Sequence, residues 1–183
     1  RLSYHSKYIS EGRANISGSL ALGELAMAAD DFFALLSRAE ADNSSFSESG
    51  LALGWLFASE SFAYELVFAH ISTYASGAPS TDNELPVWLA YEGFELLSPF
   101  IGYVYSTAEQ SSWVELGVSA NIALGGGELS PVLSSGWNQG YVADESHGLN
   151  HLQLSLEYVL PLGEGAELSA YVANSTPWQE ESG

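Results

Sequence analysis

The sequence predicts an all-β protein, an antiparallel up-and-down transmembrane β-barrel of about 12 strands, of which about 11 lie within these 183 residues. Three observations lead to this prediction. Apolar residues alternate with small or polar ones over long stretches, as in residues 113–124. The connections between such stretches alternate between short ones and longer, more polar ones. The stretches also have about the length of strands that cross a membrane at a tilt, about 9–11 residues.

The alternation locates the strands, because successive side chains of a strand point to opposite faces of the sheet. The second and third strands have a helical alternative, since ELAMAADDFFALLSRAEAD is rich in Ala, Leu and Glu. The ninth contains Pro131 and Gly136, which weaken a strand or mark a bulge. The expected strands are roughly 2–9, 18–28, 31–40, 48–58, 62–72, 84–92, 98–106, 112–124, 129–138, 149–160 and 166–173.

The connections predict one barrel domain over residues 1–183. Segments such as DD and GGGE form the short turns at one end, and segments such as YASGAPSTDN and NQGYVADESHG form long loops at the other end. Bacterial single-chain barrels have even strand numbers, and the count here is odd. We therefore expect a closing strand beyond Gly183, with the long acidic loops on the extracellular side.

Composition excludes several classes of protein. The chain has 4 Lys and Arg against 23 Asp and Glu, a formal charge of −19, which argues against binding to nucleic acid. Without cysteine it has neither disulfides nor thiolate metal sites. Its apolar content of 46% is too high for a disordered acidic tail. No metal site and no cofactor is expected.

The two faces of the expected strands differ in character. One face is apolar and is expected to contact membrane lipid, and aromatic residues such as Tyr74, Tyr91 and Trp137 lie near strand ends, where Trp and Tyr favour the lipid–water boundary. The other face is small or polar, which suits the lumen of a barrel. The residues expected to face lipid are Leu66, Phe68, Leu116, Val118, Leu154 and Leu156. Those expected to line the lumen are Glu65, Glu92, Glu115, Asn121, Glu157 and Glu167.

An acidic lumen predicts a pore that could pass small cationic or neutral solutes, because rings of carboxylates favour cations. A structural barrel filled by side chains is the alternative, since a barrel of about 12 strands is narrow. Carboxylates in the loops could bind divalent cations and so bridge to lipopolysaccharide, although their spacing matches no known calcium loop. These loop residues are Asp42, Asp82, Glu84, Asp144, Glu145, Glu180 and Glu181.

The opening LSYHSKYISEGR resembles the first strand of the TorF-type porin family of Gram-negative outer-membrane proteins. The features shared with that family are Tyr4, the Ser6–Lys7–Tyr8 step, and Gly12 beside Arg13. The stretches AYELVFAHIS, SSWVELGVS and GLNHLQLSLEY are also similar to it. A Glu at position 11, where a second basic residue is usual, departs from the pattern. The resemblance implies an outer-membrane barrel with a pore, and implies no particular substrate or oligomer partner.

Two other functions are alternatives. FAHISTYASGAPSTDNEL resembles the His-x-Ser step of outer-membrane phospholipases and lipid A deacylases, which implies a lipid-acting esterase using His70, Ser72 and either Asn83 or Glu84. Against it, Thr73 stands where those families usually have Asn, and Glu84 falls on the lumen-facing set of its strand. No catalytic residue is therefore favoured. The last alternative is a soluble β-sandwich or a filament-forming interaction module, whose strands would alternate in the same way.

Overall fold

The computed structural model describes residues 2–5, 9–10, 13–14, 18–42, 45–75, 77–141, 147–163 and 166–178. All regular structure in these ranges is β-strand. Among the same residues no helix is long and apolar enough to cross a membrane. The all-β prediction is confirmed, and the helical alternative for residues 24–42 is wrong. That stretch forms two strands joined at Asp30 and Asp31, because pairing along their whole length outweighs the helix propensity of Ala and Leu.

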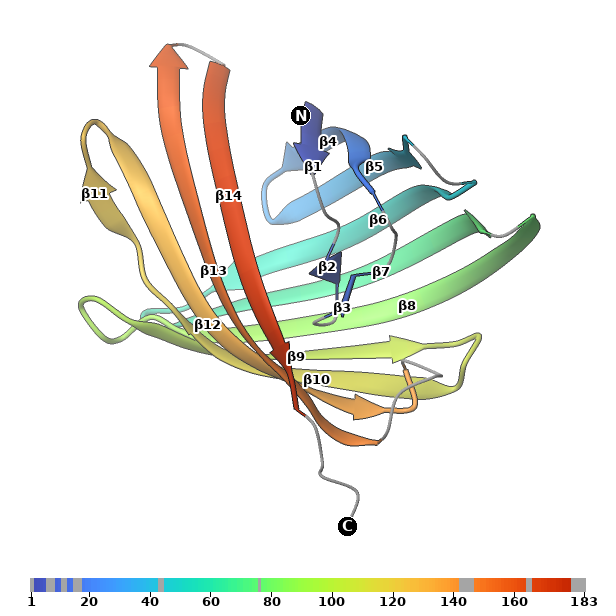
Figure 1. Ribbon diagram of the computed structural model, residues 1–183. Helices are drawn as coiled ribbons and strands as arrows, with labels where there is room; N and C mark the ends of the chain where they lie inside the picture. Colours follow the sequence, from blue (N-terminus) through green and yellow to red (C-terminus); the bar gives the residue numbers. More distant parts are fainter. Residues whose placement is uncertain are drawn as a thin grey trace.

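One antiparallel 12-stranded sheet dominates the fold (Figure 1). Its strands follow the order β1-β4-β5-β6-β7-β8-β9-β10-β12-β13-β14, and β11 pairs with β12. Consecutive strands are neighbours, which confirms the up-and-down prediction. The bounds are β1 Leu2–His5, β4 Leu20–Ala29, β5 Phe32–Ala41, β6 Ser47–Ala58, β7 Phe62–Ala75, β8 Ala78–Tyr91, β9 Ser98–Ser106, β10 Ser111–Ser119, β11 Ile122–Leu124, β12 Gly127–Gln139, β13 Gly148–Gly163 and β14 Ala166–Pro177.

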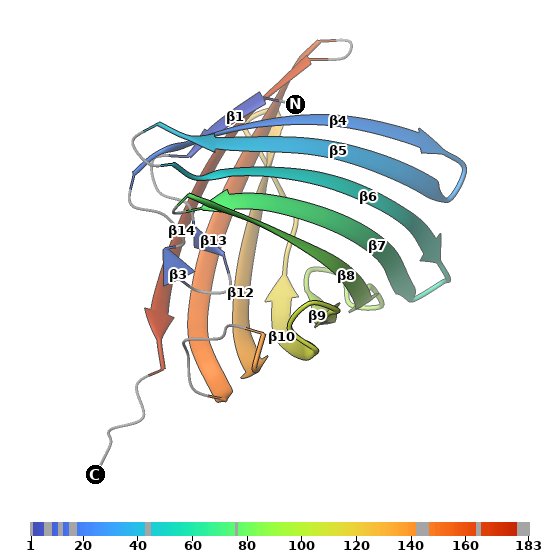
Figure 2. The ribbon, with the colours of Figure 1, turned by 90° about the vertical axis from the view of Figure 1, so that its right-hand side faces the viewer.

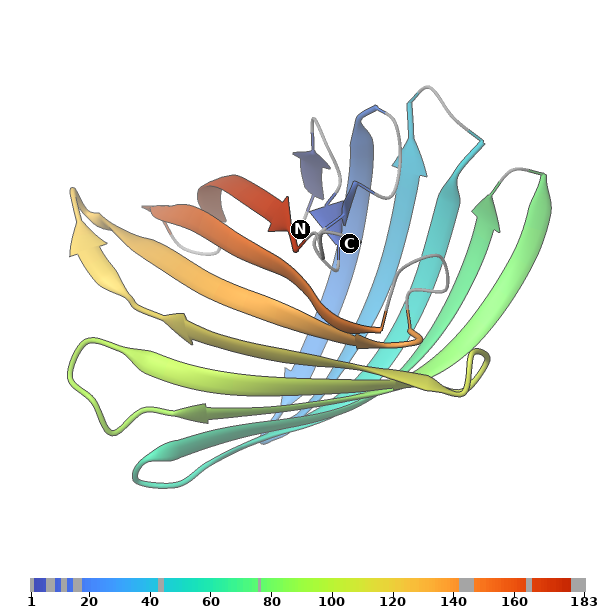
Figure 3. The same cartoon turned by 60° about the horizontal axis from the view of Figure 1, so that its bottom comes forward.

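The sheet curves into an open trough (Figure 3). Its two arms, β4–β8 and β12–β14, run in steeply different directions in Figure 2, as opposite walls of a barrel do when the strands are tilted. The edge strands β1 and β14 lie toward each other across the opening (Figures 1 and 3). Among the described residues these two strands do not pair, so the sheet is not closed.

The strand pairing assigns every side chain to one of two faces. We call the face with Leu66, Leu116 and Leu154 the outer face, and the opposite face, with Val67 and Trp113, the inner face. The three leucines are 43%, 57% and 50% exposed, whereas Val67 and Trp113 are 7% and 3% exposed. Large apolar side chains are thus exposed on the outer face. The twelve strands of the main sheet form one curved layer instead of the two packed layers that a β-sandwich requires.

Tight turns join the strands at one end of the sheet. Gly125 and Gly126 both have positive φ, 59° and 88°, between β11 and β12. A two-residue hairpin turn of this kind requires positive φ at both central positions, which glycine adopts without a steric penalty. The GGGE segment therefore forms the expected short turn.

Several expected strand boundaries were wrong. The last two strands extend beyond their expected ends, to Gly163 and Pro177. The strand predicted over 2–9 ends at His5, residues 6–8 lie outside the described residues, and β2 (Ile9–Ser10) pairs instead with β3 (Arg13–Ala14) in a separate two-stranded sheet. The long loop predicted over 73–83 is a hairpin, because its Ser and Thr residues pair across β7 and β8 around a turn at Gly77. The strand predicted over 112–124 is interrupted at Ala120 and Asn121.

Proline explains that interruption. Ala120 lies opposite Pro131 and donates its N–H to the Pro131 carbonyl, but proline has no N–H to return the bond. The predicted bulge is also present, since the β12–β13 register shifts between Gly136 and Trp137.

Candidate functional site

Carboxylates from most strands of the main sheet gather on its inner face. Of the ten Asp and Glu residues within these strands, nine belong to the inner face by pairing. The exception, Glu40, lies on the outer face in an ion pair with Arg38 at 2.8 Å. None of the described strands of the main sheet places a Lys or Arg on the inner face. The nine are Glu24, Glu48, Glu65, Asp82, Glu84, Glu115, Glu128, Glu157 and Glu167.

The residues predicted to line the lumen lie along or beside this face. Four of the predicted glutamates belong to it, namely Glu65, Glu115, Glu157 and Glu167. Asn121 lies at the break between β10 and β11 and accepts a hydrogen bond from Ser130 Oγ at 3.2 Å. Glu92 follows the end of β8, is exposed, and donates its backbone N–H to the Ser61 carbonyl.

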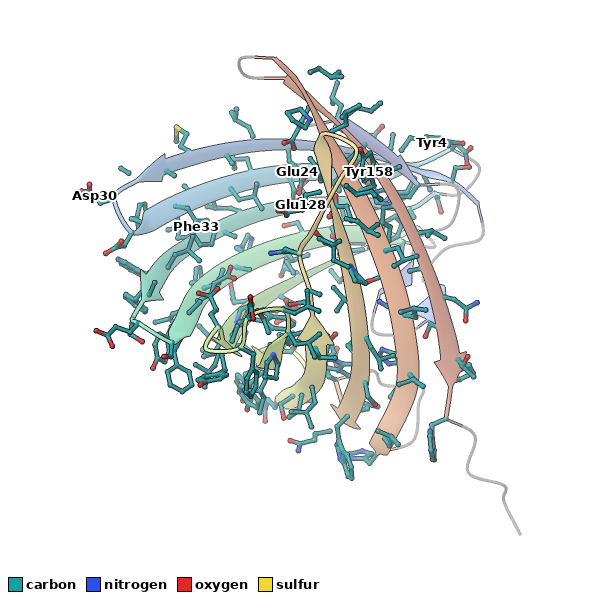
Figure 4. The ribbon with its side chains drawn as sticks, turned by 90° about the vertical axis from the view of Figure 1, so that its left-hand side faces the viewer. Tyr4, Glu24, Asp30, Phe33, Glu128 and Tyr158 are labelled. Carbon is teal, nitrogen blue, oxygen red and sulfur yellow. The ribbon has the colours of Figure 1, made fainter. Side chains whose placement is uncertain are left out.

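Sequence reasoning placed Glu84 on the lumen-facing set of its strand, and the pairing confirms that it belongs to the inner face. The other four inner-face carboxylates, Glu24, Glu48, Asp82 and Glu128, were missed. Figure 4 labels two of them, Glu24 on β4 and Glu128 on β12. Their strand phase could have identified them, since Glu24 alternates with the apolar residues Leu25 and Met27. Asp82 was expected in a loop, but it lies within β8, which begins earlier than expected.

Hydroxyl groups of neighbouring strands hold several of these carboxylates. Asp82 accepts hydrogen bonds from Ser106 Oγ at 2.5 Å and from the Ala108 N–H at 2.9 Å. Thr73 Oγ1 donates to Glu48 at 3.3 Å. The inner face is thus a hydrogen-bonded acidic surface whose oxygens face the trough.

A cluster of rings lies on the inner face near β10. The rings of Trp113 and His151 stack with centroids 5.6 Å apart, and Tyr141, beyond the end of β12, packs 6.4 Å from Trp113. The Tyr141 hydroxyl donates to Glu84 on β8. Because β9 and β10 lie between β8 and β12, this contact reaches across two strands of the inner face.

Aromatic rings on the inner face cover glycines of adjacent strands. A Cβ atom on Gly54 would lie 2.4 Å from the Phe33 ring, which Figure 4 labels. A Cβ on Gly102 would lie 2.3 Å from the Trp88 ring, and one on Gly117 would lie 2.3 Å from the Phe100 ring. These glycines leave room for a neighbouring ring to approach the backbone closely.

The outer face has an apolar surface with aromatic residues at one end. The six residues predicted to face lipid all belong to it, and Phe68 and Leu156 are 43% and 36% exposed. At the end with the short turns, Phe62 packs against Tyr91 with centroids 5.1 Å apart, and Tyr91 packs against Phe94 at 5.0 Å. Such a cluster matches the interfacial aromatic residues of membrane barrels.

The residues of the esterase hypothesis separate between the faces. His70 and Ser72 lie on the outer face of β7, and Asn83 lies opposite His70 on β8. His70 Nδ1 is 2.8 Å from Asn83 Oδ1. Glu84 belongs to the inner face, so it cannot serve as the partner of His70.

The expected divalent-cation sites in acidic loops stay predictions. Asp42 accepts a hydrogen bond from the Ser19 N–H at 3.2 Å. Asp144, Glu145, Glu180 and Glu181 lie outside the described residues. Within the described ranges, no group of three or more His, Asp or Glu residues is arranged to hold a metal ion.

The fold is similar to two outer-membrane porins of Pseudomonas aeruginosa, OccK11 (OpdR) and OpdL. The identities are 13% and 11% and the TM-scores are 0.45 and 0.43. Each alignment covers 96% of this chain and 58% of the other, so the chain spans less than two thirds of either protein. No family model and no curated protein matches the chain, and the resemblance to the TorF-type family stays a prediction. At these TM-scores, function has to be argued from the chain's own residues.

Proposed function

We propose that the protein is a porin-like β-barrel of the bacterial outer membrane, through which small cations and neutral solutes pass passively. One observation carries this proposal. Nine of the ten carboxylates in the main sheet share the inner face, and the described strands add no Lys or Arg to it. A water-filled lumen with such a wall attracts cations and repels anions.

The outer face supports the membrane part of the proposal. A water-soluble protein rarely exposes contiguous apolar patches of more than a few hundred Å². Here apolar side chains lie directly opposite one another on neighbouring strands of the outer face, as Leu53 and Phe68 do on β6 and β7 and as Leu89 and Ile101 do on β8 and β9. Hydrocarbon around that face would remove their contact with water, and lipid and lipopolysaccharide are the partners it fits.

A pore also needs a closed wall. Every pairing along the path from β1 to β14 is antiparallel, so these two strands, the first and eleventh, run in the same direction. Antiparallel closure between them takes one further strand, and the expectation of such a strand after Gly183 stays a prediction. Closure would satisfy the backbone groups at both edges, as hydrocarbon requires.

Ion selectivity in planar bilayers tests the proposal. With a KCl gradient across the membrane, the reversal potential of the purified protein should have the sign of a cation-preferring pore. Replacing Glu65, Glu115, Glu157 and Glu167 together by Gln should move it toward zero, because Gln keeps the size and removes the charge. Glu40→Gln is the matched control, since Glu40 lies on the outer face, and it should leave the reversal potential unchanged. A preference for chloride, or a fourfold variant with unaltered selectivity, would refute the proposal.

A further inference from the structure

One cross-strand row of the inner face places a glutamate on either side of an aromatic ring. Glu65 on β7 lies directly opposite Trp88 on β8. Over the next two strands, Trp88 lies opposite Gly102 and Gly102 lies opposite Glu115. Because neighbouring strands are about 4.8 Å apart, the two glutamates are about 14 Å apart at the backbone. The row therefore has a carboxyl group at each end and an indole ring between them.

The ring of Trp88 covers the gap between the two glutamates. Three atoms of that ring are the nearest neighbours of a Cβ built on Gly102, so the ring extends from β8 over β9. The Phe100 ring packs beside it, with centroids 5.8 Å apart and planes inclined by 53°. Two rings inclined in this way form an aromatic corner on the inner face, beside the line that joins Glu65 to Glu115.

We propose that this row binds linear polyamines, with terminal ammonium groups at Glu65 and Glu115 and the middle of the chain on Trp88. The proposal deepens the pore function by naming one class of cationic solute. It rests on that function, because a polyamine reaches the inner face only through a water-filled lumen.

The two carboxylates suit the ends of such a molecule. A protonated primary amine has three N–H donors, and a carboxylate has about four acceptor sites, so each glutamate can bind an ammonium group and keep other hydrogen bonds. Both glutamates are half-buried, which strengthens their attraction for a cation relative to bulk water. The described strands of the main sheet place no Lys or Arg on the inner face, so no cation of these strands competes for the two carboxylates.

The aromatic corner suits the middle of the molecule. Methylene groups gain contact with the apolar ring faces, and a secondary ammonium is attracted by the negative π face, most strongly by that of Trp. Spermidine has a secondary ammonium between its two ends. 1,8-Diaminooctane has the same number of bonds between its terminal nitrogens but only methylene groups between them. These two compounds therefore separate the effect of the ring from that of the glutamates.

Block of the potassium current in planar bilayers tests which amines bind. Spermidine should halve the current at a concentration about 5-fold lower than 1,8-diaminooctane does, because of the cation–π contact. 1,3-Diaminopropane carries the same charge as 1,8-diaminooctane but is too short to reach both glutamates, so it should need about 10-fold more than 1,8-diaminooctane. Equal block by the two diamines would overturn the proposal.

Substitution of the glutamates tests the two ends of the row. Glu65→Gln and Glu115→Gln should each raise the blocking concentration of spermidine about 10-fold, since Gln keeps the size and removes the charge. Glu157→Gln is the matched comparison, because it removes the same charge from the inner face outside this row, and it should raise that concentration less than about 3-fold. Equal effects of all three would show attraction to the whole acidic wall and overturn the proposal.

Substitution of the ring tests the middle of the row. Trp88→Leu should remove most of the preference for spermidine over 1,8-diaminooctane, and Trp88→Phe should retain part of it, because Phe keeps a π face. A merely structural role of Trp88 would change the block by both compounds alike. An unchanged preference in Trp88→Leu would overturn the proposal.

Calorimetric titration of spermidine into the detergent-solubilised protein separates the polyamine site from the pore. Spermidine binding that Glu65→Gln and Glu115→Gln both weaken, in a protein that does not conduct, would support the site and refute passage. Cation-selective conductance without spermidine binding would overturn the site and leave the pore proposal standing.

Discussion

Gly102 and Trp88 show how the inner wall is packed at the scale of single residues. All three nearest neighbours of a Cβ built on Gly102 are ring atoms of Trp88, at 2.3–2.6 Å. Gly102→Ala therefore forces the ring to move, and we expect a loss of about 1–3 kcal/mol in the free energy of unfolding. Chemical denaturation in detergent micelles measures it.

Replacing the ring should relieve this clash. In a Trp88→Leu background, Gly102→Ala should lower the free energy of unfolding by clearly less than it does in the unsubstituted protein. The reason is that the smaller Leu side chain leaves room for the Cβ atom. Equal costs in both backgrounds would show that the ring does not limit this position.

Another residue-scale prediction concerns the contact between Tyr141 and Glu84. Tyr141→Phe removes the donor to Glu84 and keeps the ring against Trp113. If this contact constricts a pore, its loss removes the link that Tyr141 makes to Glu84 across the inner face, and single-channel conductance should rise. Ser112→Ala is a suitable control, since Ser112 also bonds near the end of β12, to Gln139, but does not contact Glu84. An unchanged conductance in Tyr141→Phe would argue against a constriction here.

At the residue scale, the sequence predicts on which face of the sheet a side chain lies, but it does not predict which other side chains it contacts. The phase of Val114, Leu116 and Val118 follows from alternation alone. The contacts of His70 with Asn83, and of Tyr141 with Glu84, depend on the strand register and on the path of the chain after β12. Local pattern encodes neither of these.

A charged residue placed on the outer face of a strand should destabilise the protein more near the middle of the membrane than near its surface. Leu116 lies near the middle of the span formed by β10 and β11, and Leu124 ends that span beside the Gly125 turn. Leu116→Arg should destabilise the protein by about 2–4 kcal/mol in a bilayer, because the midplane gives the guanidinium little water. Leu124→Arg, the matched control, should cost about 0–1 kcal/mol. Unfolding in lipid vesicles measures both, and equal small costs would contradict a lipid-facing β10.

The elements themselves were largely predictable, and the exceptions have local causes. Strands such as β9 follow from alternation bounded by turn residues. The start of β8 was missed because Gly77, Pro79, Ser80 and Asp82 have the composition of a loop. There, cross-strand Ser and Thr pairs extend the hairpin beyond what composition suggests.

At the scale of the whole molecule, the proposed pore should prefer cations in a way that depends on salt concentration. If the inner-face carboxylates line a water-filled lumen, salt in that lumen screens their charge over about 10 Å at 0.1 M and about 3 Å at 1 M. Cation preference should therefore weaken as KCl rises, in reversal potentials measured at a constant concentration ratio. A preference that persists unchanged in 1 M salt would indicate one tight binding site instead of a diffuse acidic wall.

Curvature and closure were the least predictable features. The count of about 11 strands matches the path from β1 to β14, but alternation does not encode how far the sheet bends or whether its edges meet. Those properties depend on twist, tilt and stagger summed over the whole sheet.

Phe33, Trp88 and Phe100 lie against glycines of adjacent strands, in space that a Cβ atom would otherwise occupy. In a closed barrel this narrow, bulky rings directed toward the axis would obstruct much of the interior. Rings that fill the space above a glycine take up less of that interior. In a closed barrel, three of the largest inner-face side chains would therefore thicken the wall without filling the passage.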